Sequence, residues 1–330
     1  MSAARLDIVA IGNAIVDILA PAPDSLIDAL GLVRGGMQLV DAEQADALYQ
    51  KMGAAVEASG GSAANTIAGM AALGRKCGFI GQTAQDQFGK VFAHDIRANG
   101  VEFTTPALDG DLASGQCLIF VTPDGQRTMN TFLGAAQHLD AGALDKAMIE
   151  SAAILYLEGY LWNADESRGA MAEAIAIAKG AGRKVAFTLS DNFVIFGHGD
   201  AFRKMIADGD IDILFANEEE IMTLTGESDF EAAVAKASSV PTLVVTRGAD
   251  GAVALQGGER AQVSAEPVDK VLDTTGAGDL FAAGFLAGQA AGRSLTDSLT
   301  MGAVCAAEVI GHYGPRPEAD LKALVAARLG

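Results

Sequence analysis

The chain has 330 residues, half of them hydrophobic, with 39 glycines and a net charge of −19. This length allows either two average domains or one large α/β domain with a substantial core. The strong negative charge argues against nucleic acid or an anionic membrane surface as a partner.

Cysteine usage indicates the compartment. Cys77, Cys117 and Cys305 are widely spaced and form no CxxC pair, so neither a disulfide framework nor a zinc site is expected. The sequence shows no signal-peptide pattern and no apolar run of 18 residues free of breakers. We therefore expect a soluble protein of the reducing cytoplasm.

The first apolar run, residues 6–11, predicts a buried strand that ends at Gly12. Asn13 and Asp17 follow directly. Open α/β sheets bind ligands just beyond the carboxyl ends of their strands, so both side chains are candidates for ligand contact. A turn asparagine and an exposed aspartate would explain the same residues structurally.

A pair of glycines, Gly60 and Gly61, precedes a small-residue segment that predicts a helix from Ser62 to about residue 73. Glycines at this point allow a ligand to lie against the backbone. The structural alternative is that Ser62 serves only as the helix N-cap.

Residues 117–121 and 127–132 form two extended runs around a DG-containing turn, which predicts a β-hairpin. A hairpin alone is unstable in water, so we expect it to join extended segments near residues 15–20 and 37–40 in a small sheet. Arg127 lies on this hairpin, where it either serves the site or is simply solvated.

From residue 154 onward, apolar strands alternate with helices, with strands at 154–157, 185–189 and 211–215. This pattern predicts a parallel, doubly wound sheet. Tyr160 and Trp162 follow the first of these strands, where an aromatic ring either stacks on a ligand or packs in the core.

Asn217 and Glu220 fit a capping box at the start of a helix.

In the later helices, predicted at 281–291 and 299–310, Gly284 and Gly288 lie four residues apart. Because interior glycines weaken a helix, these two predict close packing against a neighbouring helix.

The segment from Asp273 to Asp279 places small residues before an acid and an apolar helix. Free amides at a helix N-terminus attract phosphate, and Gly276 and Gly278 let it approach the backbone. A carboxylate at such a site repels its ligand unless it takes a proton from an attacking hydroxyl, so Asp279 is a candidate general base. The alternative is that Asp279 only complements the helix dipole.

The run DTTGAGDLFAAGF, residues 273–285, resembles the C-terminal signature of the pfkB, or ribokinase-like, carbohydrate and nucleoside kinases. The run GGSAANTIAGMAALG, residues 60–74, resembles their N-terminal signature. The resemblance implies a ribokinase-like α/β fold, in which a doubly wound, mainly parallel sheet is flanked by helices and accompanied by a small β lid. It also implies one kinase domain over residues 1–330, with the lid formed by about 14–20, 35–41 and 114–134.

The resemblance further implies an ATP-dependent kinase with Asp279 as the base and Gly276, Ala277 and Gly278 as the anion hole. Arg127 would move toward the phosphates. The NxxE motif would order Mg²⁺ through Glu220 and water, and a K⁺ site would be expected at Asp273 and Thr275. The nucleotide would contact Asn217, Thr246, Arg247, Gly248 and Gly251.

The start GNAIVD and the hairpin segment resemble the adenosine kinase branch most closely, which implies transfer to the 5′-hydroxyl of adenosine. A sugar kinase, another nucleoside kinase and an inactive ligand-binding relative remain alternatives. The family includes monomers and homodimers. The residues implied to contact the acceptor are Asn13, Asp17, Met37, Leu39, Gly60, Gly61, Asn65, Cys117, Leu133 and Tyr160.

Other nucleotide-binding classes lack their motifs here. The first strand is not followed by GxGxxG, as a Rossmann dehydrogenase requires, and GxxxxGK[ST] is absent, which argues against a P-loop enzyme.

Overall fold

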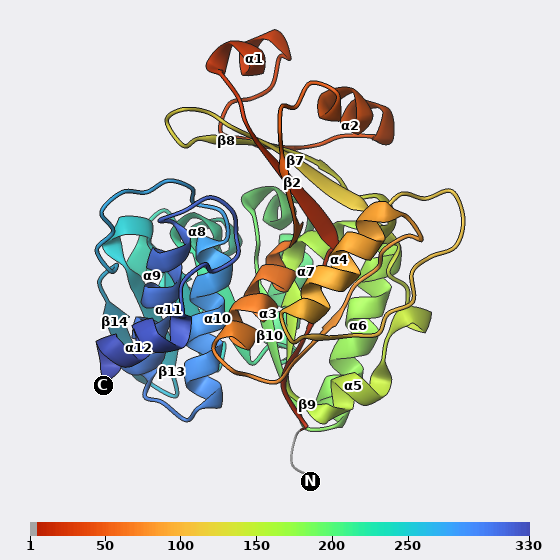
Figure 1. Cartoon of the computed structure of the whole chain (residues 1–330). Helices are drawn as coiled ribbons and strands as arrows, with labels where there is room; N and C mark the ends of the chain where they lie inside the picture. The colour runs from red at the N-terminus through yellow and green to blue at the C-terminus, as the bar shows by residue number, and fades with distance from the viewer. Residues whose placement is uncertain (1–4) are drawn as a thin grey trace.

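A computed structural model describes residues 5–330. Its centre is a nine-stranded sheet in the order β14-β13-β12-β11-β10-β9-β1-β5-β6 (Figure 1). Only the pairings of β13 with β12 and β14 are antiparallel. The strands are β1 (Leu6–Ile11), β5 (Cys77–Ile80), β6 (Glu102–Phe103), β9 (Ala152–Glu158), β10 (Lys184–Thr188), β11 (Ile213–Asn217), β12 (Thr242–Thr246), β13 (Ala252–Gln256) and β14 (Glu259–Val263).

Both faces of the large sheet are covered by helices. In β1, Ile8 and Ala10 enter one apolar core while Val9 and Ile11 enter the other, which explains why the strand is apolar at successive positions. The first core includes α3 (Ser62–Ala72), α4 (Gln87–Ala98), α10 (Ala277–Ala290), α11 (Leu295–Val309) and α12 (Leu321–Leu329). The second includes α5 (Lys146–Ser151), α6 (Asp165–Gly180), α7 (Asn192–Ala207), α8 (Glu218–Thr225) and α9 (Phe230–Lys236).

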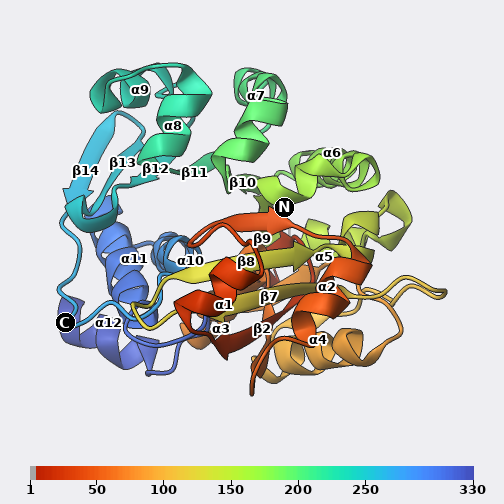
Figure 2. The same cartoon turned by 90° about the horizontal axis from the view of Figure 1, so that it is seen from above.

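A second, five-stranded sheet, here called the small sheet, has the order β3-β8-β7-β2-β4. Two helices, α1 (Asp24–Ala29) and α2 (Ala42–Tyr49), cover its outer face, as Figure 2 shows from above. The strands are β2 (Ile15–Pro21), β3 (Met37–Leu39), β4 (Val56–Gly60), β7 (Gly115–Val121) and β8 (Arg127–Phe132).

The predicted doubly wound sheet and small sheet are confirmed, including the hairpin of β7 and β8. In its turn, Gly125 has a φ of +80°, a conformation that glycine adopts without strain. The sequence analysis did not identify β4 or α7. Across residues 5–330, no helix combines the length and apolarity needed to cross a membrane.

The predicted close packing at Gly284 and Gly288 is confirmed. A β-carbon at Gly284 would lie 2.4 Å from the carbonyl oxygen of Met301 on α11, and one at Gly288 would lie 2.7 Å from Ser298 Oγ. The two helices can therefore approach closely only because these positions lack side chains.

We expect Gly284→Ala to lower the free energy of unfolding by about 1–3 kcal/mol, because the new methyl group must displace backbone. Gly169 in α6 is the matched control, since a β-carbon there would meet no atom within 4 Å. Gly169→Ala should stabilise by up to about 1 kcal/mol through helix propensity. Denaturant unfolding measures both changes, and equal effects would contradict the packing explanation.

Candidate active site

A cavity of about 390 Å³ lies between the small sheet and the edge of the large sheet. The last residues of four neighbouring parallel strands line it, as expected for ligand sites in open α/β sheets. They are Glu158, Thr188, Asn217 and Thr246. The first turn of α10 and the inner face of the small sheet complete the wall.

Asp279 lies in the first turn of α10 and lines the cavity. Its Oδ1 accepts a hydrogen bond from Ser62 Oγ at 2.6 Å, and its Oδ2 accepts one from Asn65 Nδ2 at 2.9 Å. Burial raises the pKa of Asp279, while these two donors and the nearby arginines Arg316 and Arg127 oppose the shift. The carboxylate is thus held by α3 while remaining at the cavity wall.

Ser62 is not the N-cap of α3. The helix begins at Ser62, and Gly61 occupies the N-cap with a φ of +94°. The Ser62 hydroxyl is consequently free to bind Asp279, which gives it a place in the site that the N-cap alternative did not include.

The backbone around Gly276 forms the predicted turn into α10. Gly276 is the N-cap and has a φ of +73°, and a β-carbon there would lie 2.9 Å from Pro315. Ala277 N donates to the Thr274 carbonyl oxygen at 3.3 Å. The amides of Gly276, Gly278 and Asp279 donate to no acceptor within residues 5–330, so these three are available to an anion.

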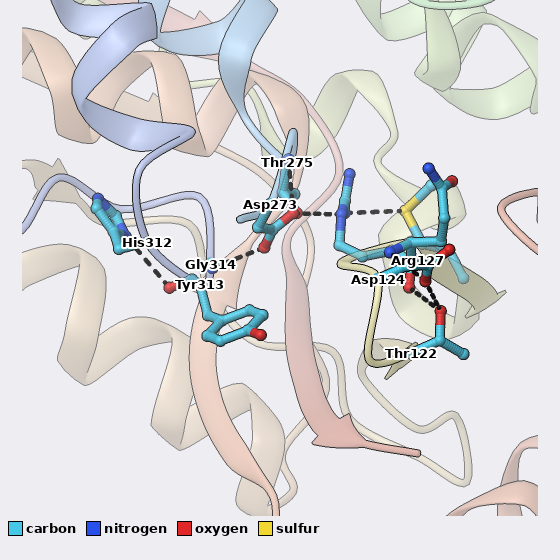
Figure 3. A network of polar contacts seen from close by, with 10 residues as sticks. Thr122, Asp124, Arg127, Asp273, Thr275, His312, Tyr313 and Gly314 are labelled. Carbon is cyan, nitrogen blue, oxygen red and sulfur yellow. Dashed lines mark hydrogen bonds and ion pairs between the residues drawn. The ribbon is translucent and has the colours of Figure 1, made fainter. Parts of the chain in front are cut away.

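Arg127 extends from β8 to the loop that precedes this turn, where it forms an ion pair with Asp273 Oδ1 (Figure 3). The Asp273 side chain is fully buried and that of Arg127 is 10% exposed. Asp273 also accepts from Thr275 N at 2.8 Å, Thr275 Oγ1 at 2.5 Å and Gly314 N at 2.8 Å. The small sheet is thereby joined to the loop before α10.

Asp17, on β2, is buried and lines the cavity, and its carboxylate makes no hydrogen bond to any described residue. Burial raises its pKa to about 7, although Arg316 and Arg127 lower it. A β-carbon at Gly60 would lie 2.2 Å from this carboxylate. Glycine at position 60 is therefore required by Asp17 itself.

Gly61 lies against Asn13 in the same way, because a β-carbon there would be 2.2 Å from the Asn13 carbonyl oxygen. Of the two glycines, only Gly61 lines the cavity.

Glu158 is the site residue whose role the sequence did not reveal. It is fully buried, and Oε1 accepts from both Asn13 N and Asn13 Nδ2 at 2.7 Å, while Oε2 accepts from Ala63 N at 2.7 Å. Burial raises its pKa to about 7 against the effect of these donors. Glu158 therefore joins β9, the loop after β1 and the start of α3.

Two side-chain oxygens in the cavity wall lack donors. Asn13 Oδ1 and Asn65 Oδ1 are buried and have no hydrogen-bond partner among the described residues. Unpaired buried acceptors are costly, so their presence in a cavity wall indicates places where ligand hydroxyls donate.

The small sheet supplies most of the apolar surface of the cavity. Met37, Leu39, Cys117 and Leu133, all predicted to contact an acceptor, line the cavity together with Ile119 and Met129. Tyr160 also lines it, with its ring centroid 6.2 Å from that of Phe193, a cavity residue on α7 that the sequence analysis missed. Trp162 packs in the core against Phe187 and Phe202 instead.

The residues predicted to contact the nucleotide divide into two groups. Asn217 and Thr246 line the cavity. Arg247 pairs with Glu218 at 3.0 Å and lies over the Phe230 ring at 4.1 Å. The cavity lining does not include Arg247, Gly248 or Gly251.

The capping box of Asn217 and Glu220 is confirmed, with three hydrogen bonds of 2.8 to 3.0 Å. Glu220 also lines the cavity, and burial raises its pKa to about 7, with Asp191 and Glu219 adding to the rise. A carboxylate surrounded by other acids suits a nearby cation. Glu220 at the cavity wall fits a hydrated Mg²⁺ carried by phosphates. Among residues 5–330, no three acidic, histidine or cysteine side chains lie close enough together to hold a metal ion directly.

The chain was compared with known proteins. A family model described as pfkB family carbohydrate kinase matches residues 25–321. The crystal structure of adenosine kinase from Sinorhizobium meliloti shares 44% identity, with a TM-score of 0.93 over 98% of this chain and 99% of that one. A probable sugar kinase from Rhizobium etli CFN 42 shares 41% identity, with a TM-score of 0.94 and the same coverage.

The adenosine kinase of Saccharomyces cerevisiae is 28% identical over 331 residues, which is 93% of this chain and 96% of the yeast protein. The overlap with the two bacterial structures confirms the ribokinase-like fold. Members of the matched family are kinases that phosphorylate hydroxyl groups of sugars or nucleosides, and this chain belongs to the pfkB family of carbohydrate kinases.

Proposed function

We propose that this kinase transfers the γ-phosphoryl group of ATP to the 5′-hydroxyl of adenosine. The observation that carries the proposal is the mixed lining of the cavity. Apolar side chains of the small sheet suit a purine, while Asp17 on the same sheet and the unpaired oxygens of Asn13 and Asn65 suit the ribose hydroxyls. The 44% identity to an adenosine kinase supports the same acceptor.

In this reaction Asp279 accepts the proton of the 5′-hydroxyl as its oxygen attacks the γ-phosphorus, and the bond from that phosphorus to the β,γ-bridging oxygen breaks to release ADP. The raised pKa of Asp279 improves it as a proton acceptor. The free amides of Gly276 and Gly278, with Ala277 between them, stabilise charge on the transferred group.

Mg²⁺ bound to the ATP phosphates would neutralise part of their charge, and Glu220, which lines the cavity, would hold it through water. Asp273 and Thr275 remain our proposed K⁺ site, beside the anion hole. Thr246 and Asn217 would contact the nucleotide within the cavity, with Arg247, Gly248 and Gly251 beyond its lining.

We infer that the small sheet acts as the lid of a single kinase domain spanning residues 1–330. Its contributing segments are about 14–20, 35–41 and 114–134, together with β4. The three cysteines are buried free thiols, which fits our proposal of a cytoplasmic enzyme, monomeric or homodimeric, without nucleic-acid or membrane partners.

A sugar acceptor is the second candidate, favoured by the 41% identity to a probable sugar kinase. The experiment that separates the two is a panel of adenosine, inosine, ribose and fructose assayed with MgATP. The proposal requires adenosine to give the highest kcat/KM. Turnover of a sugar without turnover of adenosine would contradict it, and binding without turnover of any acceptor would indicate an inactive relative.

Asp17 should control acceptor affinity. Its raised pKa of about 7 means that the carboxylate, which accepts hydrogen bonds from ribose hydroxyls, is lost as pH falls through about 7. We expect the KM for adenosine to rise below that pH in the wild type. Asp17→Asn should raise KM roughly 10- to 100-fold with little change in kcat, and should flatten this pH dependence. An unchanged KM would exclude the role.

A further inference from the structure

Arg316 lies in the loop between α11 and α12, and its guanidinium group reaches back to the active site. It donates from Nε and Nη2 to the Ser59 carbonyl oxygen at 3.0 and 2.7 Å, from Nη2 to Ser59 Oγ at 2.7 Å, and from Nη1 to the Ala64 carbonyl oxygen at 2.6 Å. All these acceptors are neutral. Within residues 5–330 no carboxylate lies within 4.0 Å of Arg316 to form an ion pair.

The two segments that Arg316 holds both carry active-site residues. Ser59 is followed by Gly60, against which the Asp17 carboxylate lies. Ala64 lies between Ser62 and Asn65, whose side chains hold both oxygens of Asp279. A single side chain from the C-terminal part of the chain therefore fixes the backbone beside both acids.

The two residues before Arg316 contact the anion hole. Pro315 lies against Gly276, and Gly314 N donates to Asp273 Oδ2 at 2.8 Å (Figure 3). Three consecutive residues thus contact two stretches that are distant in sequence, the loop of Asp273 and Gly276 and the segment from Ser59 to Ala64. The loop around Arg316 therefore helps to fix the position of the anion hole relative to Asp17 and Asp279.

We propose that Arg316 is a positioning residue for phosphoryl transfer. It holds the first turn of α3 and the end of β4 against the loop beside the anion hole, and it supplies an unpaired positive charge to Asp279 and Asp17. This inference rests on the proposed function, because it assumes that Asp279 is the base and Asp17 contacts the acceptor.

The positive charge of Arg316 changes the pKa of both acids in one direction. Asp17 and Asp279 face the positive groups Arg316 and Arg127, and face each other and the acids Asp273 and Glu158. Asp95 also stabilises the charge of Arg316, and it accepts hydrogen bonds from Ser59 N and Ser59 Oγ. Arg316 lowers the pKa of both Asp17 and Asp279, so its removal should move their titration to higher pH.

The test compares Arg316→Met, which removes the charge, with Arg316→Lys, which retains it but loses the planar set of donors. We expect Arg316→Met to lower kcat about 100-fold, as misplacement of catalytic groups does, and to move the acidic limb of the pH profile upward. Arg316→Lys should restore the position of that limb while restoring kcat only partly. Arg260→Met, which removes an exposed arginine paired with Glu231, is the control and should match the wild type.

A role in folding alone would lower the yield or stability of the variants and leave the pH limb in place. If Arg316→Met does not fold, Ser59→Ala provides the milder change, since it removes one of the hydrogen bonds of Arg316, and it should lower kcat by a smaller factor. Wild-type kcat and an unmoved limb in folded Arg316→Met would overturn the proposal.

A second readout separates this inference from the proposed function. Carboxyl ¹³C resonances of labelled aspartates, assigned with Asp17→Asn and Asp279→Asn, report titration without any turnover. Upward movement in Arg316→Met supports the inference even if adenosine is not the acceptor. Unmoved titrations in a protein that phosphorylates adenosine would overturn the inference alone.

Discussion

Asp279→Asn should lower kcat by about 10²- to 10⁴-fold while adenosine and ATP binding remain nearly unchanged. The physical reason is that the amide cannot accept the proton of the attacking hydroxyl. The substitution preserves the size of the side chain, and the new amide oxygen can still accept from Ser62 Oγ. Steady-state kinetics and calorimetric titration of both ligands measure the two effects separately.

The matched control for this substitution is Asp111→Asn, an exposed aspartate in a loop. It should leave both kcat and binding at wild-type values. A loss of less than about tenfold in kcat for Asp279→Asn would exclude the general-base role, given the contribution that such groups make.

Glu158→Ala should produce the largest loss of stability, lowering the free energy of unfolding by about 3–5 kcal/mol. The change removes a fully buried acceptor and leaves the donors Asn13 N, Asn13 Nδ2 and Ala63 N without their partner. Denaturant unfolding measures the loss. Because Asn13 lines the cavity, we also expect a higher KM for the acceptor in whatever folded protein remains.

Glu166→Ala serves as the comparison, since this glutamate is 60% exposed and contacts only His138 among the described side chains. It should change stability by less than about 0.5 kcal/mol. If Glu158→Ala and Glu166→Ala were equally stable, the hydrogen bonds of Glu158 would contribute little to the free energy of unfolding.

The sequence predicted correctly those features that depend on a few neighbouring residues. The turn at Gly125, the small-residue contact at Gly284 and the capping box at Asn217 are all properties of neighbouring residues or of helix periodicity. Each could therefore be inferred without knowledge of the tertiary structure. Asp279 was predicted in the same way, as an acid beside a turn expected to bind phosphate, and it lines the cavity.

The missed features depend on contacts between distant segments. Glu158 binds residues 145 and 95 positions away, and Arg316 binds residues 257 and 252 positions away. No local pattern distinguishes such a glutamate or arginine from an exposed one. The strand β4, VEASG, was missed because it carries only one large apolar residue, and Val56 is itself exposed.

The pair of Arg127 and Asp273 has a consequence for the order of events in a catalytic cycle. One guanidinium group holds a fully buried carboxylate, so in the proposed reaction a polyphosphate that contacts Arg127 would compete with that carboxylate for the same cation. In the proposed reaction, contact of the donor phosphates with Arg127 would therefore loosen the link between the hairpin and the loop before α10.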